Sequence, residues 1–169
     1  GKLTTVTEGD YDIVSVVNID TKGGWLYFIA SLDNAIQRYL YRVPLNRRAA
    51  PERLTPAIQP GQHSYQMSPD AKWAIHTYSS AANVPVIDLV SLPDHKVVRA
   101  FVNNSKLQAT VNAVAMGDME FFQVVTDEGV TLDGSLIKPT HFDASKKYPV
   151  LFFVYGEPWG QTVQDRWGG

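Results

Sequence analysis

The residue best placed to do chemistry in this sequence is Tyr155, which directly follows the apolar residues 150–154. A continuous run of β-branched and aromatic residues between two prolines predicts a strand over 148–158 that is buried on both faces. Such strands belong to mostly parallel sheets, whose functional side chains follow the carboxyl ends of the strands. Gly156 lets the backbone turn sharply there, and a phenol at that turn can donate a hydrogen bond into a crevice. The alternative is that Tyr155 is one more aromatic residue of the core.

Glu157 and Trp159 follow Tyr155 closely and are the two candidates for substrate binding. Glu157 can line the same crevice, although a carboxylate on a solvated loop is the alternative. Trp159 can contact substrate, cover the crevice or pack at the start of a helix.

Neither a metal site nor a complete hydrolytic site is predicted from these residues. The chain has no cysteine, and its four histidines lie on separate predicted elements without the spacing of metal ligands: His63, His76, His95 and His141. Hydrolysis on an α/β sheet uses a serine in a G-x-S-x-G motif, followed along the chain by Asp and His. The sequence contains no such motif. We therefore expect the 169 residues to be inactive alone, with the Ser/Asp/His triad beyond Gly169 in a longer enzyme.

Composition excludes several classes of function. Hydrophobic residues make up 44% and charged residues 19% of the chain, as in an ordinary globular protein. A net charge of −2 gives no electrostatic case for nucleic acid or for an anionic membrane surface. No apolar run approaches the ~20 residues that cross a bilayer. No cofactor is predicted.

The first two thirds of the chain predict two units of four short antiparallel strands. The first unit has strands at 11–20, 25–30, 39–45 and 52–55, and the second at 63–67, 73–78, 85–90 and 96–101. Trp25 and Trp73 open the second strand of each unit and are 48 residues apart. A period of about 40–50 residues with four strands per repeat predicts blades of a β-propeller. We expect both tryptophans to be buried at equivalent places.

The pattern changes after residue 101. Residues 103–110 begin with asparagines suited to cap a short helix, which makes this stretch the expected domain boundary. Residues 120–125 and 131–137 predict a hairpin around 127–129. A connection through residues 138–142 then leads to the apolar strand.

Two segments near the end of the chain resemble a known peptidase family. Residues 142–149, Phe-Asp-Ala-Ser-Lys-Lys-Tyr-Pro, are the most specific piece, and Tyr-Gly-Glu-Pro follows at 155–158. Together they resemble the prolyl oligopeptidase family, and within it the dipeptidyl peptidase IV branch, at the third strand of the α/β-hydrolase domain. The resemblance implies that the Tyr155 hydroxyl is one donor of the oxyanion hole.

The resemblance also implies a fold and a function. The fold is mainly β, with the last two four-stranded blades of a β-propeller at 1–104 and the incomplete beginning of an α/β-hydrolase domain at 105–169. The parent protein would be a serine exopeptidase that releases X-Pro or X-Ala dipeptides from peptide N-termini. Alternatives are an acylaminoacyl peptidase or endopeptidase of the same family, or a non-catalytic propeller that binds a protein or glycan. We expect peptides with a penultimate proline or alanine as partners, self-association into a homo-oligomer, and an exported parent, periplasmic or extracellular.

Overall fold

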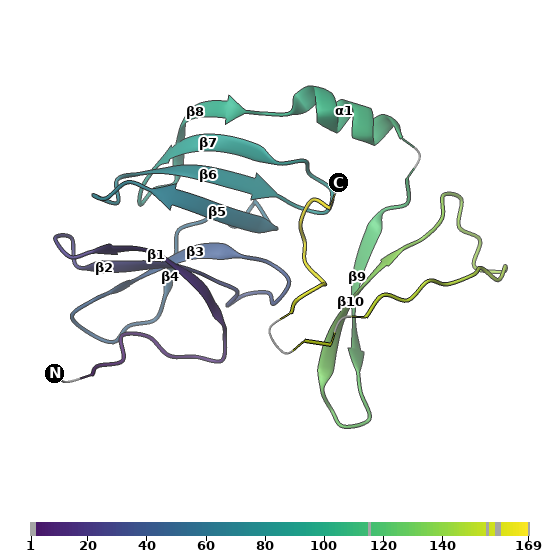
Figure 1. The fold of residues 1–169 in the computed structure, drawn as a ribbon, viewed down its shortest axis with the longest axis horizontal. Helices are drawn as coiled ribbons and strands as arrows, with labels where there is room; N and C mark the ends of the chain where they lie inside the picture. The colour runs from purple at the N-terminus through teal and green to yellow at the C-terminus, as the bar shows by residue number, and fades with distance from the viewer. Residues whose placement is uncertain (1–2, 115, 155, 158–159, 169) are drawn as a thin grey trace.

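The computed structural model describes residues 3–114, 116–154, 156–157 and 160–168. It contains ten strands and one helix within these residues (Figure 1). The strands are β1 (Ile13–Asp20), β2 (Trp25–Ala30), β3 (Tyr39–Pro44), β4 (Glu52–Arg53), β5 (Gln62–Met67), β6 (Trp73–Ser79), β7 (Val86–Ser91), β8 (Lys96–Val102), β9 (Met119–Val125) and β10 (Thr131–Ile137). The helix α1 (Ser105–Ala113) lies between β8 and β9.

Two four-stranded antiparallel sheets form the larger part of the molecule. The first sheet has the order β1-β2-β3-β4 and the second β5-β6-β7-β8, so each strand pairs with its neighbour in sequence. Trp25 opens β2 and Trp73 opens β6, at the same place in each sheet. The predicted repeat of two four-strand units is therefore confirmed.

The core lies where the two sheets face each other. Side chains alternate between the faces of a strand, so Tyr27 and Ile29 of β2 share one face with Leu40 of β3. That face packs against Ala74 and Val90 of the second sheet. The opposite face of β2 and β3 forms a second buried cluster, which the segment before β1 covers in part: Phe28, Ala30, Tyr39, Tyr41 and Val43. The first sheet is thus buried on both of its faces at β2 and β3.

The expected burial of both tryptophans is wrong for Trp73. Trp25 packs partly buried against the core between the sheets, whereas Trp73 is 44% exposed. In β6, Ala74 points toward the core between the sheets, so Trp73 and Ile75 point to the other face of the second sheet. No element of the described chain covers that face. The two tryptophans occupy equivalent positions in their sheets, but only Trp25 packs against the other sheet.

A helix and a hairpin follow the sheets, as the sequence predicts. The side-chain oxygen of Asn103 accepts a hydrogen bond from the N–H of Ser105 at 3.1 Å, at the start of α1. The Gln108 side chain ties α1 to the segment before β7, because it accepts from the N–H of Val84 at 2.9 Å. Strands β9 and β10 pair only with each other among the described strands, and a turn at 126–129 joins them. None of the helices in the described chain has the length and apolar character of a membrane span.

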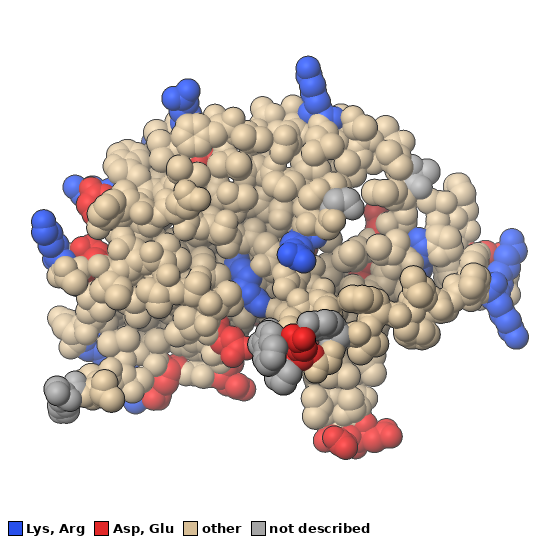
Figure 2. All heavy atoms as spheres, viewed as in Figure 1, with Lys and Arg blue, Asp and Glu red and all other residues tan. Residues whose placement is uncertain are grey.

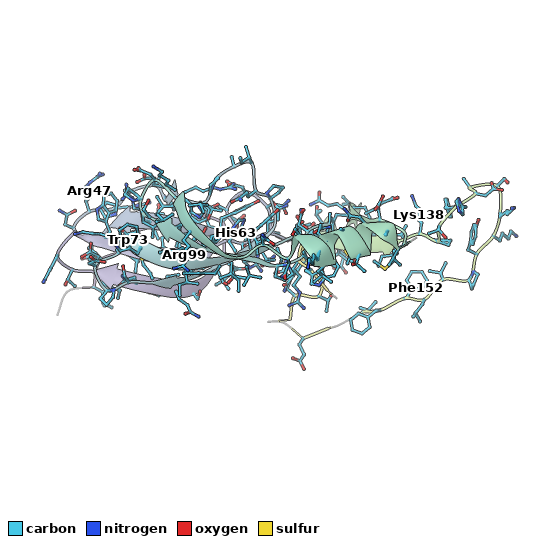
Figure 3. All side chains as sticks on the ribbon, turned by 90° about the horizontal axis from the view of Figure 1, so that it is seen from above. Arg47, His63, Trp73, Arg99, Lys138 and Phe152 are labelled. Carbon is cyan, nitrogen blue, oxygen red and sulfur yellow. The ribbon has the colours of Figure 1, made fainter. Side chains whose placement is uncertain are left out.

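The predicted strand over 148–158 is absent from the described residues of that stretch. Residues 151–154 have no regular secondary structure and are strongly exposed, Leu151 at 96% and Phe152 at 83%. Figure 3 shows Phe152 on an extended segment that stands apart from the sheets. A strand buried on both faces needs a strand on each side and layers above and below it. In the described chain β9 and β10 are the nearest sheet, and neither pairs with this segment.

Charged side chains are spread over the surface. On the face shown in Figure 2, Lys and Arg side chains stand along the top, Asp and Glu predominate along the lower edge, and both signs lie side by side at the left. Acidic side chains also stand at the tip of the hairpin, where the sequence has Asp127 and Glu128. This pattern agrees with the net charge of −2.

Candidate functional site

The sequence-predicted site residues occupy the segment at 155–159. Tyr155 and Trp159 lie outside the residues that the structure describes. Glu157 is exposed, and its carbonyl oxygen accepts a hydrogen bond from the N–H of Gly160 at 2.9 Å. The described residues that follow the predicted site and contact the two large sheets begin at Gln161.

Residues 161–167 run back against the two large sheets, and Asp165 makes the central contact (Figure 1, yellow segment). One carboxylate oxygen accepts from the side-chain amide of Gln37 at 2.8 Å, and the other accepts from the N–H of Ala81 at 2.9 Å. The N–H of Asp165 itself donates to the carbonyl of Ile36 at 2.9 Å. Asp165 is only 9% exposed. Gln37 precedes β3 and Ala81 follows β6, so one carboxylate joins both sheets.

Gln161 makes a second attachment, which involves only the first sheet. Its side-chain amide donates to the carbonyl of Ala35 at 2.7 Å, and its side-chain oxygen accepts from the guanidinium of Arg38. Farther along, the N–H of Trp167 donates to the hydroxyl of Ser79 at 3.5 Å. Together with Asp165, these contacts attach the segment at three places along its length.

The loops that receive this segment are themselves held in place. The Asn34 side chain accepts from the N–H of Ile36 at 3.0 Å, and Gln62 donates to the Ile36 carbonyl at 2.8 Å. Gly61 has φ of +140° and no space for a Cβ, because the backbone oxygen of Ser79 lies against it. Glycine is required at this close approach of the two loops. These contacts hold the two loops in the conformation that residues 161–167 bind.

A polar chain connects Asp165 to the inside of the first sheet. The Tyr39 hydroxyl donates to the side-chain oxygen of Gln37, whose amide in turn donates to Asp165. The guanidinium of Arg53 lies over the Tyr39 ring, 3.5 Å from its centroid. Burial raises the pKa of the Tyr39 phenol, so it remains a hydrogen-bond donor at neutral pH. The orientation of the Gln37 amide is fixed by this donor on one side and the carboxylate on the other.

Three of the four histidines form a buried stack that was not predicted from the sequence. His63 of β5 and His76 of β6 stack with centroids 5.1 Å apart, and His95 meets His76 edge-on at 4.7 Å. Tyr65 joins the stack, and its hydroxyl lies 2.8 Å from Nε2 of His95. The spacing of these residues along the chain carried no signal of the cluster. Cross-strand pairing produces it, since His76 lies opposite Tyr65 in the register of β5 and β6.

Hydrogen bonds assign the tautomers of two of these rings. Nε2 of His63 lies 2.8 Å from the carbonyl of Gln59, which can only accept, so this nitrogen carries the proton. Nδ1 of the neutral His63 ring is therefore an acceptor, and Nε2 of His76 donates to it at 2.8 Å. Nδ1 of His76 is then a buried acceptor, and no donor from the described residues reaches it.

Burial keeps the stack uncharged. Loss of solvation lowers the pKa of His63 to about 4 and that of His76 to about 3, and it also lowers the pKa of His95. The nearby guanidinium of Arg53 adds to the effect at His63, whereas the carboxylate of Asp88 opposes it at His95. The described residues include no set of three or more ligand side chains arranged around one metal position. The stack is thus a neutral packing element between the sheets.

Comparison with known proteins identifies the family. Residues 1–85 match the family model described as the dipeptidyl peptidase IV (DPP IV) N-terminal region. The chain belongs to the dipeptidyl peptidase IV family. The resemblance seen in the sequence is thereby confirmed.

Relatives of this dipeptidyl peptidase IV family member match it far beyond residue 85. A probable dipeptidyl-aminopeptidase B of Emericella nidulans is 34% identical over 164 residues, which are 95% of this chain and 18% of the relative. Dipeptidyl peptidase 4 of Trichophyton rubrum is 28% identical over 99% of this chain and 21% of its own length. The crystal structure of Porphyromonas gingivalis dipeptidyl peptidase 4 matches with a TM-score of 0.87 and 27% identity, over 97% of this chain and 23% of that chain. The chain spans about a fifth of the length of these curated relatives.

Proposed function

We propose that this chain is part of a serine-type dipeptidyl peptidase, which releases X-Pro or X-Ala dipeptides from the N-termini of peptides. The observation that carries the proposal is the match to Porphyromonas gingivalis dipeptidyl peptidase 4 over 97% of the chain. A match of that extent includes residues well beyond the two large sheets. The likeness to a dipeptidyl peptidase therefore extends past the last strand of the second sheet, which ends at Val102.

We propose two domains within the chain. Residues 1–104 would be the last two blades of a β-propeller, and residues 105–169 the beginning of an α/β-hydrolase domain. The change of structure supports the boundary, because the second sheet ends with β8 at Val102 and α1 begins at Ser105. In this proposal the strand predicted over 148–158 forms only when the rest of the hydrolase sheet pairs with it.

Acyl transfer on such a fold assigns a role to Tyr155. Attack of a serine on the peptide carbonyl gives a tetrahedral intermediate whose oxygen carries negative charge. A fixed donor at that oxygen lowers the barrier by about 2.7–4 kcal/mol. The Tyr155 hydroxyl would be this donor, and Glu157 and Trp159 would line the adjoining crevice. The Ser/Asp/His triad would come from the part of the longer protein that this chain does not span.

Peptide substrates that differ in one group test the proposal with the full-length protein. An Ala-Pro p-nitroanilide with a free amino terminus should be cleaved, whereas the same compound with an acetylated amino terminus should not. Treatment with a fluorophosphonate, which acylates activated serines, should abolish the cleavage.

Other outcomes would contradict the proposal. Preference for the acetylated compound would favour an acylaminoacyl peptidase, and cleavage within long peptides would favour an endopeptidase. No hydrolysis of any of these substrates would favour a non-catalytic propeller. Cleavage that survives the fluorophosphonate would exclude a serine nucleophile.

A further inference from the structure

We infer that Asp165 is a positioning residue, which holds residues 161–167 against the two large sheets and so restricts the chain that leads to Tyr155. This inference rests on the proposed function, because it concerns the geometry of the proposed oxyanion donor. It adds to that proposal a connection between the peptidase segment and the first 104 residues.

The contacts of Asp165 fit a tether better than they fit a surface carboxylate. Asp165 is 9% exposed and accepts hydrogen bonds from Gln37, which precedes β3 of the first sheet, and from the N–H of Ala81, which follows β6 of the second. A buried carboxylate is costly unless donors satisfy it, and here both of its oxygens have one. Removal of the carboxylate would also leave two buried donors without an acceptor.

The tether is close enough along the chain to restrict Tyr155. Residues 156–160 alone separate Tyr155 from Gln161, which is itself attached to Ala35 and Arg38. The Glu157–Gly160 hydrogen bond of 2.9 Å shortens that connection further. A small displacement of a catalytic donor lowers the reaction rate steeply, and a shift of about 1 Å can lower it about 100-fold. Fixing residues 161–165 on the sheets therefore limits the positions open to the tyrosine hydroxyl.

The hydrogen-bond pattern suggests a variant and its rescue. In Asp165→Asn the new amide can present its N–H groups to the amide of Gln37, which is also a donor. The Gln37 side chain cannot reverse freely, since its oxygen accepts from Tyr39. In the double variant Asp165→Asn with Gln37→Glu, the glutamate can accept from both the asparagine and the tyrosine. The carboxylate and the amide have then exchanged places.

Steady-state kinetics of the full-length protein on the Ala-Pro p-nitroanilide test the inference. Asp165→Asn should lower kcat by about 10-fold to 100-fold with KM little changed. Gln37→Glu places a second carboxylate beside that of Asp165 and should lower kcat as well. The double variant should recover most of the lost kcat. Arg166→Gln changes an exposed neighbour and should behave as the wild type.

A second series separates positioning from general loss of structure. In a Tyr155→Phe background, Asp165→Asn should have little further effect on kcat, because the hydroxyl that it positions is gone. Full additivity of the two substitutions, or no recovery in the exchanged pair, would overturn the inference. A normal kcat for Asp165→Asn would do the same. If Tyr155→Phe alone leaves kcat unchanged, the proposed function of Tyr155 fails first, so the two failures are distinguishable.

Discussion

At the residue scale, the buried histidine stack makes the contact between the two sheets sensitive to acid. His63, His76 and His95 are neutral in the folded protein because burial disfavours their charged forms. The stack sits among Tyr39, Tyr65 and Tyr78, with Arg53 and Asp88 as its nearest charged neighbours. His76 contacts both of the other rings, so a proton added to it would place a charge beside two imidazoles.

The stability of the chain should fall as the pH falls from about 6.5 to about 4. The unfolded chain binds protons at histidines near their ordinary pKa of about 6.5, whereas folded His63 resists protonation until about pH 4. The unfolded state therefore holds more protons in this window, which lowers the free energy of unfolding by about 1.4 kcal/mol per pH unit for each such histidine. Above pH 6.5 the contribution is fully present. Urea unfolding at a series of pH values measures the slope.

His76→Phe and His141→Gln give the matched comparison for this prediction. His76→Phe removes one buried imidazole. The free energy of unfolding of this variant should therefore depend less steeply on pH between 6.5 and 4, by about 1.4 kcal/mol per pH unit, which corresponds to one proton. His141 is exposed and outside the stack, and its replacement should leave the slope as in the wild type. Equal slopes for the wild type and His76→Phe would contradict the account of the stack.

Neither Asp165 nor the histidine stack could be found from the sequence, for the same physical reason. Asp165 is 128 residues from Gln37 and 84 from Ala81, so no local pattern links them. The histidines meet through strand register and stacking, which depend on a turn length and a blade geometry that spacing alone does not define.

At the scale of elements, the strands were predictable because each alternates or forms a short apolar run between turn residues. β2 and β10 start and end where the sequence predicts, and the other strands differ by one or two residues at their ends. The strand expected over 148–158 does not form among the described residues, because the same apolar pattern needs neighbouring strands that the described chain lacks. Trp73 shows the same dependence on the surroundings. It opens β6 as predicted, but it is exposed and not buried, because no described element covers its face of the sheet.

We expect self-association through β1 and β8. Each is an edge strand with exposed apolar side chains, and the outer edge of each pairs with no other described strand. β1 exposes Ile13, Val14, Val16 and Ile19, each at 45% or more, and β8 is exposed along its whole length. Edges of this kind pair with other chains unless charge or Pro blocks them. Sedimentation velocity of this chain at increasing concentration should therefore show dimers or larger species.

Charged substitutions on the same strands test the mechanism of association. Val16→Lys and Val98→Lys place a lysine on β1 and β8, respectively, and should each shift the distribution toward the monomer. Association that is unchanged by both would exclude these edges. A well-folded wild-type monomer at high concentration would contradict the prediction itself.

At the scale of the whole molecule, the chain joins a pair of sheets to the residues that we propose as the beginning of a second domain. The segment that begins after Tyr155 returns to the ends of β3 and β6 through Asp165, so the first and last parts of the chain meet. If Tyr155 is the oxyanion donor that we propose, catalysis depends on both parts, because the sheets hold residues 161–167, which follow it closely in sequence. Family membership accounts for the fold of residues 1–85, and Tyr155 carries the chemical proposal.

The most direct test of the central claim is the Tyr155→Phe substitution in the full-length protein. Phenylalanine keeps the ring and removes the hydroxyl, so the transition state loses a donor while packing is preserved. Turnover of the Ala-Pro p-nitroanilide should then fall about 10²–10³-fold in kcat, with KM and thermal melting little altered. A normal kcat, or a lowered melting temperature with near-normal turnover, would contradict the claim and make Tyr155 a structural residue.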